Sequence, residues 1–118
     1  RELDALVAEK VMGWVGLLIN ESQSVVVGHR PHEYFETGYT DLKEVPLYST
    51  SIAAAWEVVE KLKERYLVNI VVDGASQYAQ FVEFRDDDVL TYLAENGTMP
   101  ENIAKAALLA VSAERRRS

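Results

Sequence analysis

Residues 67–94 read LVNIVVDGASQYAQFVEFRDDDVLTYLA, and this stretch decides the expected fold. Asp73-Gly74 and a run of three aspartates divide it into three apolar runs, 67–72, 78–84 and 89–94. Both dividers are typical of turns, and strands joined by short turns pair most readily in antiparallel order. The stretch therefore predicts a small three-stranded antiparallel sheet, whose first connection we expect to be longer than two residues.

The segment before this sheet has the clearest helical pattern in the chain. The hydroxyl groups of residues 48–51 (YSTS) can cap a helix, and apolar residues at helical spacing follow from Ile52 to Tyr66. Trp56 and Tyr66 both fit the apolar stripe of this helix. We therefore expect both rings in the core, with stacking on a ligand as the alternative.

The segment after the sheet predicts a second helix. Thr98 and Glu101 have the spacing of a capping box, and Pro100 is tolerated in a first helical turn. This helix runs to the basic tail at residues 115–117, which suits the negative end of the helix dipole.

The first 46 residues are less regular. Residues 1–13 have a helical stripe that ends at Gly13, and the apolar runs 14–19 and 25–27 predict two strands around a polar turn. Residues 29–46 contain both histidines and two prolines without an obvious period, as in a loop that binds something or forms an interface. The helical stripe within residues 1–13 consists of Leu3, Leu6, Val7 and Val11.

Together the elements predict one α+β domain over residues 1–118, with helices packed against a small antiparallel sheet as in an α-β-α sandwich. A chain of 118 residues has the length of one domain, and 48% hydrophobic residues supply a core. The chain contains no cysteine. Disulfides, thiol nucleophiles and cysteine zinc sites are therefore excluded.

The charge balance bears on the choice of partners. Twelve basic and 19 acidic side chains give a net charge of −7, whereas phosphate contacts to a nucleic-acid duplex need a cationic face. No apolar run approaches the roughly 20 residues of a membrane span, and the first turn is acidic where a leader would be cationic. We therefore expect a cytoplasmic protein with no DNA or RNA duplex and no membrane as partner.

Motifs for catalysis and metal binding are weak. His29, His32 and Glu33 are of metal-ligating types, but Pro31 prevents a helix from presenting them on one face. Residues 86–88 lack the glycine and the distal glutamate of a calcium loop, so an acidic turn fits better. No phosphate-loop or hydrolase motif is present. We expect no metal, no cofactor and no catalytic residue, and hence a protein that is not an enzyme.

Arginines are the more informative residues. Arg30 lies in the irregular segment, Arg65 ends the central helix, and Arg115 begins the basic tail. Several arginines in one pocket suit a small phosphorylated ligand, because a guanidinium matches phosphate oxygens. The alternative is that each arginine is a solvated end of a helix or strand. Three aromatic residues are candidates for stacking on the base of such a ligand: Tyr34, Tyr92 and Trp14.

Three blocks of sequence, read together, carry a resemblance. They are LVAEKVMGW (6–14), YSTSIAAAWEVV (48–59) and PENIAKAAL (100–108), and from the first to the last they span nearly the whole chain. Their order and spacing resemble the phage ABA sandwich domain family. The best understood members are similar to this chain in size and belong to the Thoeris anti-defence class. Such a protein is a sponge, which binds the cyclic ADP-ribose isomer made by a bacterial TIR-domain protein without degrading it.

The resemblance implies a homo-oligomer, from dimer to hexamer, with ligand pockets at subunit boundaries. It implies ligand contacts from Tyr92, in the strand before the last helix, and from Asn102, in the first turn of that helix. Arg30 and Arg115 would meet the two phosphates. Arg65 would serve a second site, since some members also hold cyclic oligonucleotides.

Two other functions stay open, namely a phage accessory protein that binds a host protein through its acidic surface and an enzyme that processes a nucleotide. We expect Asn102→Ala to abolish ligand binding at little cost to the fold, because Thr98 still caps the helix. We expect Trp56→Ala to cost roughly 3–5 kcal/mol if Trp56 lies in the core.

Overall fold

The computed structural model describes residues 2–20, 22, 25–30, 42–74 and 76–117. Of these, residues 116 and 117 are described by their backbone only. In chain order the elements are α1 (Glu2–Leu6), a π-helical turn η1 (Val7–Val11), β1 (Val15–Asn20), β2 (Val25–His29), β3 (Lys43–Glu44), α3 (Ile52–Leu62), β4 (Leu67–Asp73), β5 (Ser76–Arg85), β6 (Asp88–Glu95) and α4 (Met99–Arg117).

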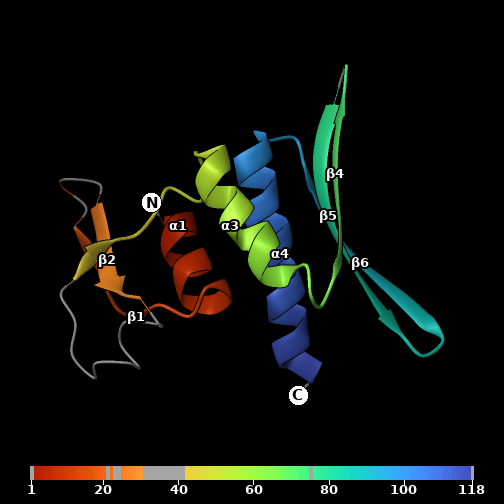
Figure 1. The fold of residues 1–118 in the computed structure, drawn as a ribbon, viewed down its shortest axis with the longest axis horizontal. Helices are drawn as coiled ribbons and strands as arrows, with labels where there is room; N and C mark the ends of the chain where they lie inside the picture. Colours follow the sequence, from red (N-terminus) through yellow and green to blue (C-terminus); the bar gives the residue numbers. More distant parts are fainter. Residues whose placement is uncertain (1, 21, 23–24, 31–41, 75, 118) are drawn as a thin grey trace.

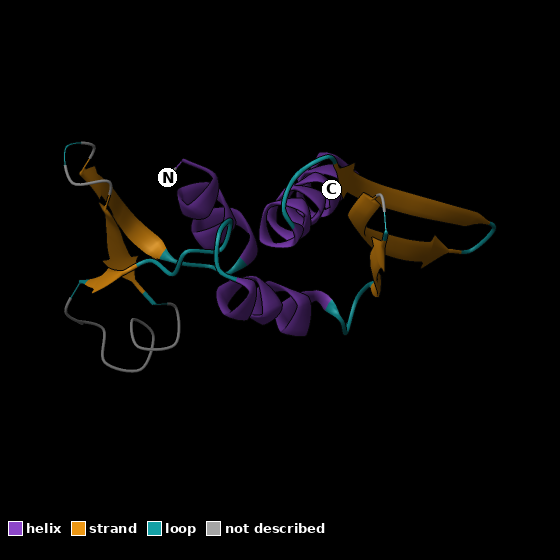
Figure 2. Ribbon diagram, turned by 90° about the horizontal axis from the view of Figure 1, so that it is seen from above, coloured by secondary structure: helices purple, strands orange, loops and turns teal. Residues whose placement is uncertain are grey.

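The helices form a central layer with an antiparallel sheet on each side (Figures 1 and 2). One sheet has the strand order β1-β2-β3 and the other has the order β4-β5-β6. The expected α+β class is confirmed, and so are the strand pair before residue 29 and the three-stranded sheet after residue 67. The chain nevertheless builds two sheets around its helices, where one sheet with helices against it was expected. The sequence pattern missed the second sheet because its third strand, β3, has only two residues.

The core joins all three layers. Helix α4 contacts α1, η1, α3, β5 and β6, so it lies at the centre of the packing (Figure 1). The sheet that contains β2 joins the same cluster of buried side chains through Val26 and Val45, and the other sheet joins through Ala79 and Phe81.

The N-terminal helix ends where the glycine predicted. Gly13 has φ +84°, a left-handed conformation that stops a helix at no steric cost to glycine. Before it the helix widens, because the N–H of Met12 donates to the carbonyl of Val7 at 3.0 Å. This widening shifts the buried face, so Leu6 is exposed although it fits the predicted stripe. Asp4 is buried instead, and its Oδ1 accepts the N–H of Ser49 at 2.7 Å.

Helix α3 begins at its predicted cap, since the Ser51 hydroxyl accepts the N–H of Ala54 at 3.3 Å. It ends at Leu62, before Tyr66. Tyr66 is buried as expected, and its ring meets the ring of Tyr92 edge-on at 6.4 Å. The core prediction for Trp56 is wrong, because this side chain is 47% exposed. The covered part of α3 is narrower than the apolar stripe, and its buried residues are Ala55, Val58, Val59 and Leu62.

The β4-β5-β6 sheet has one covered and one uncovered face. The register pairs Val68 with Phe81 and Phe81 with Tyr92, and cross-strand partners point to the same side. These three side chains pack toward the helices. Asp73 pairs with Ser76, so the first connection is a two-residue turn, shorter than expected. The opposite side, called the outer face below, carries seven apolar residues: Leu67, Val71, Tyr78, Val82, Phe84, Val89 and Leu93.

Candidate functional site

Trp14 is the centre of the candidate site. It follows the stop at Gly13, and its indole is buried between the N-terminal helix and the first sheet. The guanidinium carbon of Arg30, just past the end of β2, lies 5.6 Å from the centroid of the Trp14 ring. At this distance a cation is attracted to the negative face of the ring. Arg30 is therefore held at the site while its side chain stays exposed.

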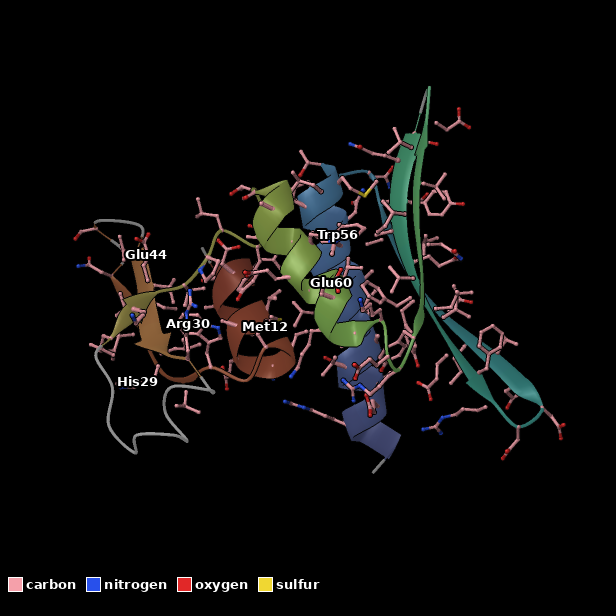
Figure 3. The ribbon with its side chains drawn as sticks, viewed as in Figure 1. Met12, His29, Arg30, Glu44, Trp56 and Glu60 are labelled. Carbon is pink, nitrogen blue, oxygen red and sulfur yellow. The ribbon has the colours of Figure 1, made fainter. Side chains whose placement is uncertain are left out.

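A cavity of about 380 Å³ opens beside this pair. Its volume lies within the range of small-molecule sites, roughly 300–1,000 Å³. Met12 comes from the turn after η1, Arg30 from the end of β2, and Trp56 and Glu60 from α3 (Figure 3). We call this the Trp56 cavity. Its remaining lining residues are Trp14, Pro46, Tyr48, Ala53 and Glu57.

Tyr48 is neutral at the wall of this cavity. Burial raises the pKa of its hydroxyl to about 12, although a hydrogen bond from Trp14 and the charge of Arg30 act in the opposite direction. The charge of Glu57 raises the same pKa. A neutral hydroxyl on a buried ring provides an apolar wall with one polar atom, which suits a flat organic group.

A second cavity, of about 540 Å³, shares the wall formed by Trp14. Arg115 lines it from the end of α4, and its Nη2 donates to the carbonyl of Lys10 at 3.3 Å. Arg30 and Arg115 therefore line two cavities that share Trp14 in their linings. The other lining residues of the second cavity are Glu9, Gly13, Val15, Gly16 and Leu17.

Tyr92 and Arg65 lie elsewhere, against Tyr66. Arg65 Nη1 donates to both carboxylate oxygens of Glu114, at 2.9 and 3.0 Å, and the guanidinium carbon lies 5.7 Å from the centroid of the Tyr66 ring. Tyr92 packs on the same ring from the covered face of the sheet. A phosphate at Arg65 would have to compete with the carboxylate of Glu114 for the guanidinium.

Asn102 is completely buried, with 0% of its side chain exposed. Its Oδ1 accepts the N–H of Gly97 at 3.2 Å, and its Nδ2 donates to the carbonyls of Gly97 and Gln77 at 3.1 and 3.2 Å. The side chain thus ties the start of α4 to the turn before it and to β5. Because all three bonds are partly buried, the structure leads us to expect that Asn102→Ala destabilises the fold, contrary to the expectation from the sequence.

The five predicted ligand residues thus occupy three places in one subunit. Arg30 and Arg115 lie at the Trp14 cavities, Tyr92 and Arg65 at Tyr66, and Asn102 near the start of α4. Asn102 and Arg115 are 13 positions apart on one helix, which is about 20 Å at 1.5 Å per residue. One subunit therefore does not bring all five side chains into one pocket.

Several residues of the Trp56 cavity were missed at the level of sequence. In the sequence, Tyr48 stands out only as part of a capping run, and Trp56 as a core residue with stacking on a ligand as the alternative. The sequence feature that could have indicated a binding site was the proximity of aromatic and hydroxyl residues at the start of α3. The same feature is equally typical of packing in a core. Tyr34, His32 and Glu33, the other candidates for stacking or metal binding, lie outside the described residues.

The residues that the structure describes form neither a metal-binding cluster nor a membrane-spanning helix. Among these residues, no group of three or more His, Cys, Asp or Glu side chains is placed to hold a metal ion. None of the helices formed by these residues is both long enough and apolar enough to cross a membrane.

Comparisons with known proteins agree with the fold. The family model of the phage ABA sandwich domain matches residues 5–108, so the chain belongs to this family. A similar solved structure is the 2.0 Å crystal structure of a phage protein from Bacillus cereus ATCC 14579. It is 26% identical, with a TM-score of 0.59 over 91% of this chain and 86% of that one. No curated protein matches the sequence significantly.

Proposed function

We propose that this phage protein binds and sequesters a cyclic ADP-ribose isomer without degrading it, and so blocks the Thoeris immune signal of a bacterial TIR-domain protein. The single observation that carries the proposal is the pair of cavities around Trp14, each with an arginine in its lining. The resemblance to the sponge class supplies the identity of the ligand, and the family match over residues 5–108 supports that resemblance.

The chemistry of these cavities suits such a ligand. A guanidinium pairs with phosphate oxygens through two parallel hydrogen bonds, and Arg30 and Arg115 offer two such groups near one ring. Exposed tryptophan provides a surface on which a base stacks, and Trp56 is such a residue in the first cavity. The net charge of −7 does not oppose this, because a pyrophosphate needs only a few local cations.

The proposal includes assembly of identical subunits. The separation of the predicted ligand residues within one subunit supports a pocket completed by a second copy. The outer face offers a surface for assembly, because its paired apolar side chains Phe84 and Val89 are 66% and 60% exposed. Its polar centre is satisfied internally, since Asn69 Nδ2 donates to Gln80 Oε1 at 3.0 Å. Two such faces would meet without charged side chains repelling each other at their centres.

Phe84→Asp tests the assembly. We expect the wild-type molar mass from light scattering to be a multiple of 13.3 kDa, and we expect the variant to give a smaller mass at the same concentration. The reason is that a buried, unpaired carboxylate opposes association. Leu109→Asp is the matched control, because Leu109 is also exposed but lies on α4. A wild-type protein of 13.3 kDa at every concentration would overturn the assembly.

Calorimetric titration of the purified protein with TIR-derived cyclic ADP-ribose isomers tests the function. We expect tight binding by the wild type, with intact ligand recovered by chromatography after the complex is denatured. Arg30→Ala should weaken binding at least tenfold, because it removes a charged hydrogen-bond donor from the cavity. Lys61→Ala, an exposed cation on α3 that does not line the Trp56 cavity, should bind as the wild type does.

The same titration separates the other functions. Recovery of a converted product would identify a nucleotide-processing enzyme instead. No heat with any isomer would overturn sequestration of these ligands, and binding to cyclic oligonucleotides and to host proteins would then be measured in turn.

A further inference from the structure

Trp56 is a large apolar side chain that the fold leaves half exposed at the edge of a cavity. Its position on α3 suits burial by sequence pattern, yet the helix packs through its neighbours Ala55 and Val59 instead. The Glu60 carboxylate, four residues further along α3, lies 2.6 Å from the ammonium of Lys63. The exposed surface of the Trp56 ring lines the Trp56 cavity.

Carboxylates stand beside this ring. Glu57 and Glu60 both line the cavity, and Glu60 is already paired with Lys63. The negative charge of Glu57 raises the pKa of Tyr48, so this charge lies near the cavity wall. An ionised carboxylate accepts hydrogen bonds and donates none. Next to an aromatic surface, Glu57 therefore favours a flat group whose edge carries a donor, and it repels one whose edge carries only an acceptor.

We propose that the Trp56 cavity selects the base of the nucleotide: Trp56 stacks on a purine, and Glu57 accepts a hydrogen bond from its exocyclic amine. The cavity then prefers adenine to unsubstituted purine, in which a hydrogen replaces the amine. Arg30 lines the same cavity and takes a phosphate of the same ligand. The inference rests on the proposed function and adds to it the residue that distinguishes one base from another.

The test compares two ligands and three variants. The ligands are a cyclic ADP-ribose isomer with a free exocyclic amine and the same compound with a hydrogen in place of that amine. We expect the wild type to prefer the adenine ligand about tenfold, since the second ligand lacks the hydrogen bond to a charged acceptor. Glu57→Gln should abolish this preference, because an amide both donates and accepts. Trp56→Ala should weaken both ligands at least tenfold through lost stacking.

Glu64→Gln is the matched control, because it makes the same change of charge at an exposed glutamate that does not line the cavity. It should keep the wild-type preference. Circular dichroism should show the native spectrum for all three variants, since the side chains are exposed. If the wild type binds both ligands equally, or if Glu57→Gln keeps the preference, base selection by Glu57 is overturned while the proposed function stands. If the wild type binds neither ligand, both fail.

Discussion

Phe81→Ala should lower the free energy of unfolding by about 4 kcal/mol. Phe81 is completely buried in the middle of β5, and its ring meets that of Tyr66 edge-on, with 6.1 Å between the ring centroids. Truncation removes a large apolar group and leaves a cavity between the sheet and helix α4, which the rigid strands on either side cannot close. Urea unfolding followed by circular dichroism measures the change.

The matched control for Phe81→Ala is Trp56→Ala, which removes an exposed aromatic ring. We expect this control to lower the free energy of unfolding by less than about 1 kcal/mol, not the roughly 3–5 kcal/mol of a core tryptophan, because the half-exposed ring loses little burial. Equal losses in the two variants would contradict the assignment of Phe81 to the core and of Trp56 to the surface.

Asn102→Ala should lower the free energy of unfolding by about 3 kcal/mol. The change leaves the N–H of Gly97 and the carbonyls of Gly97 and Gln77 without the side-chain partners that they have in the wild type. Unpaired polar groups in a buried place keep their full cost of desolvation. Thermal and urea unfolding measure the loss, with ligand titration of the same sample.

Thr98→Ala is the control for Asn102→Ala. The Thr98 hydroxyl accepts the N–H of Glu101 at 3.4 Å in an exposed cap, so its removal should cost only about 1 kcal/mol. If Asn102→Ala kept wild-type stability and lost ligand binding, Asn102 would act on the ligand and not on the fold. If it lost both, a loss of binding would reflect the disturbed start of α4.

The helix starts and the hairpins were predictable because they depend on neighbours in the chain. Ser51 and Thr98 cap their helices as expected, since a cap needs only backbone N–H groups two or three residues ahead. Gly13 stops the first helix because glycine alone enters the left-handed region freely. The pairing of β4, β5 and β6 follows from alternation and turn residues.

The features that the sequence did not predict depend on contacts between distant parts of the chain. Helical spacing cannot show how much of a stripe its neighbours cover, so Leu6 and Trp56 were placed inside. Asp4 was assigned to the polar side, and yet it is buried because the N–H of Ser49, 45 residues away, donates to it. The bonds of Asn102 to Gly97 and Gln77 could not be predicted either, because they depend on the approach of β5 to the start of α4. Its contact with a ligand stays a prediction.

The candidate site also has a part that the sequence could suggest and a part that it could not. Arginine and aromatic residues could be proposed as chemical types, because phosphate and base recognition need those groups in any fold. Their grouping was not predictable, since Arg30 and Arg115 approach Trp14 from opposite ends of the chain. Arg65 was equally suitable by sequence, but Glu114 lies beside it in the folded chain.

The sequence by itself determined the α+β class, the family and the ends of most elements. These depend on local hydrogen bonding, on periodicity and on residue chemistry, all of which act over a few positions. The tertiary structure alone decided that helices separate two sheets, that Trp56 lines a cavity and that Asn102 bonds to Gly97 and Gln77. Each of these depends on contacts between residues tens of positions apart, and only the packed chain brings those residues together.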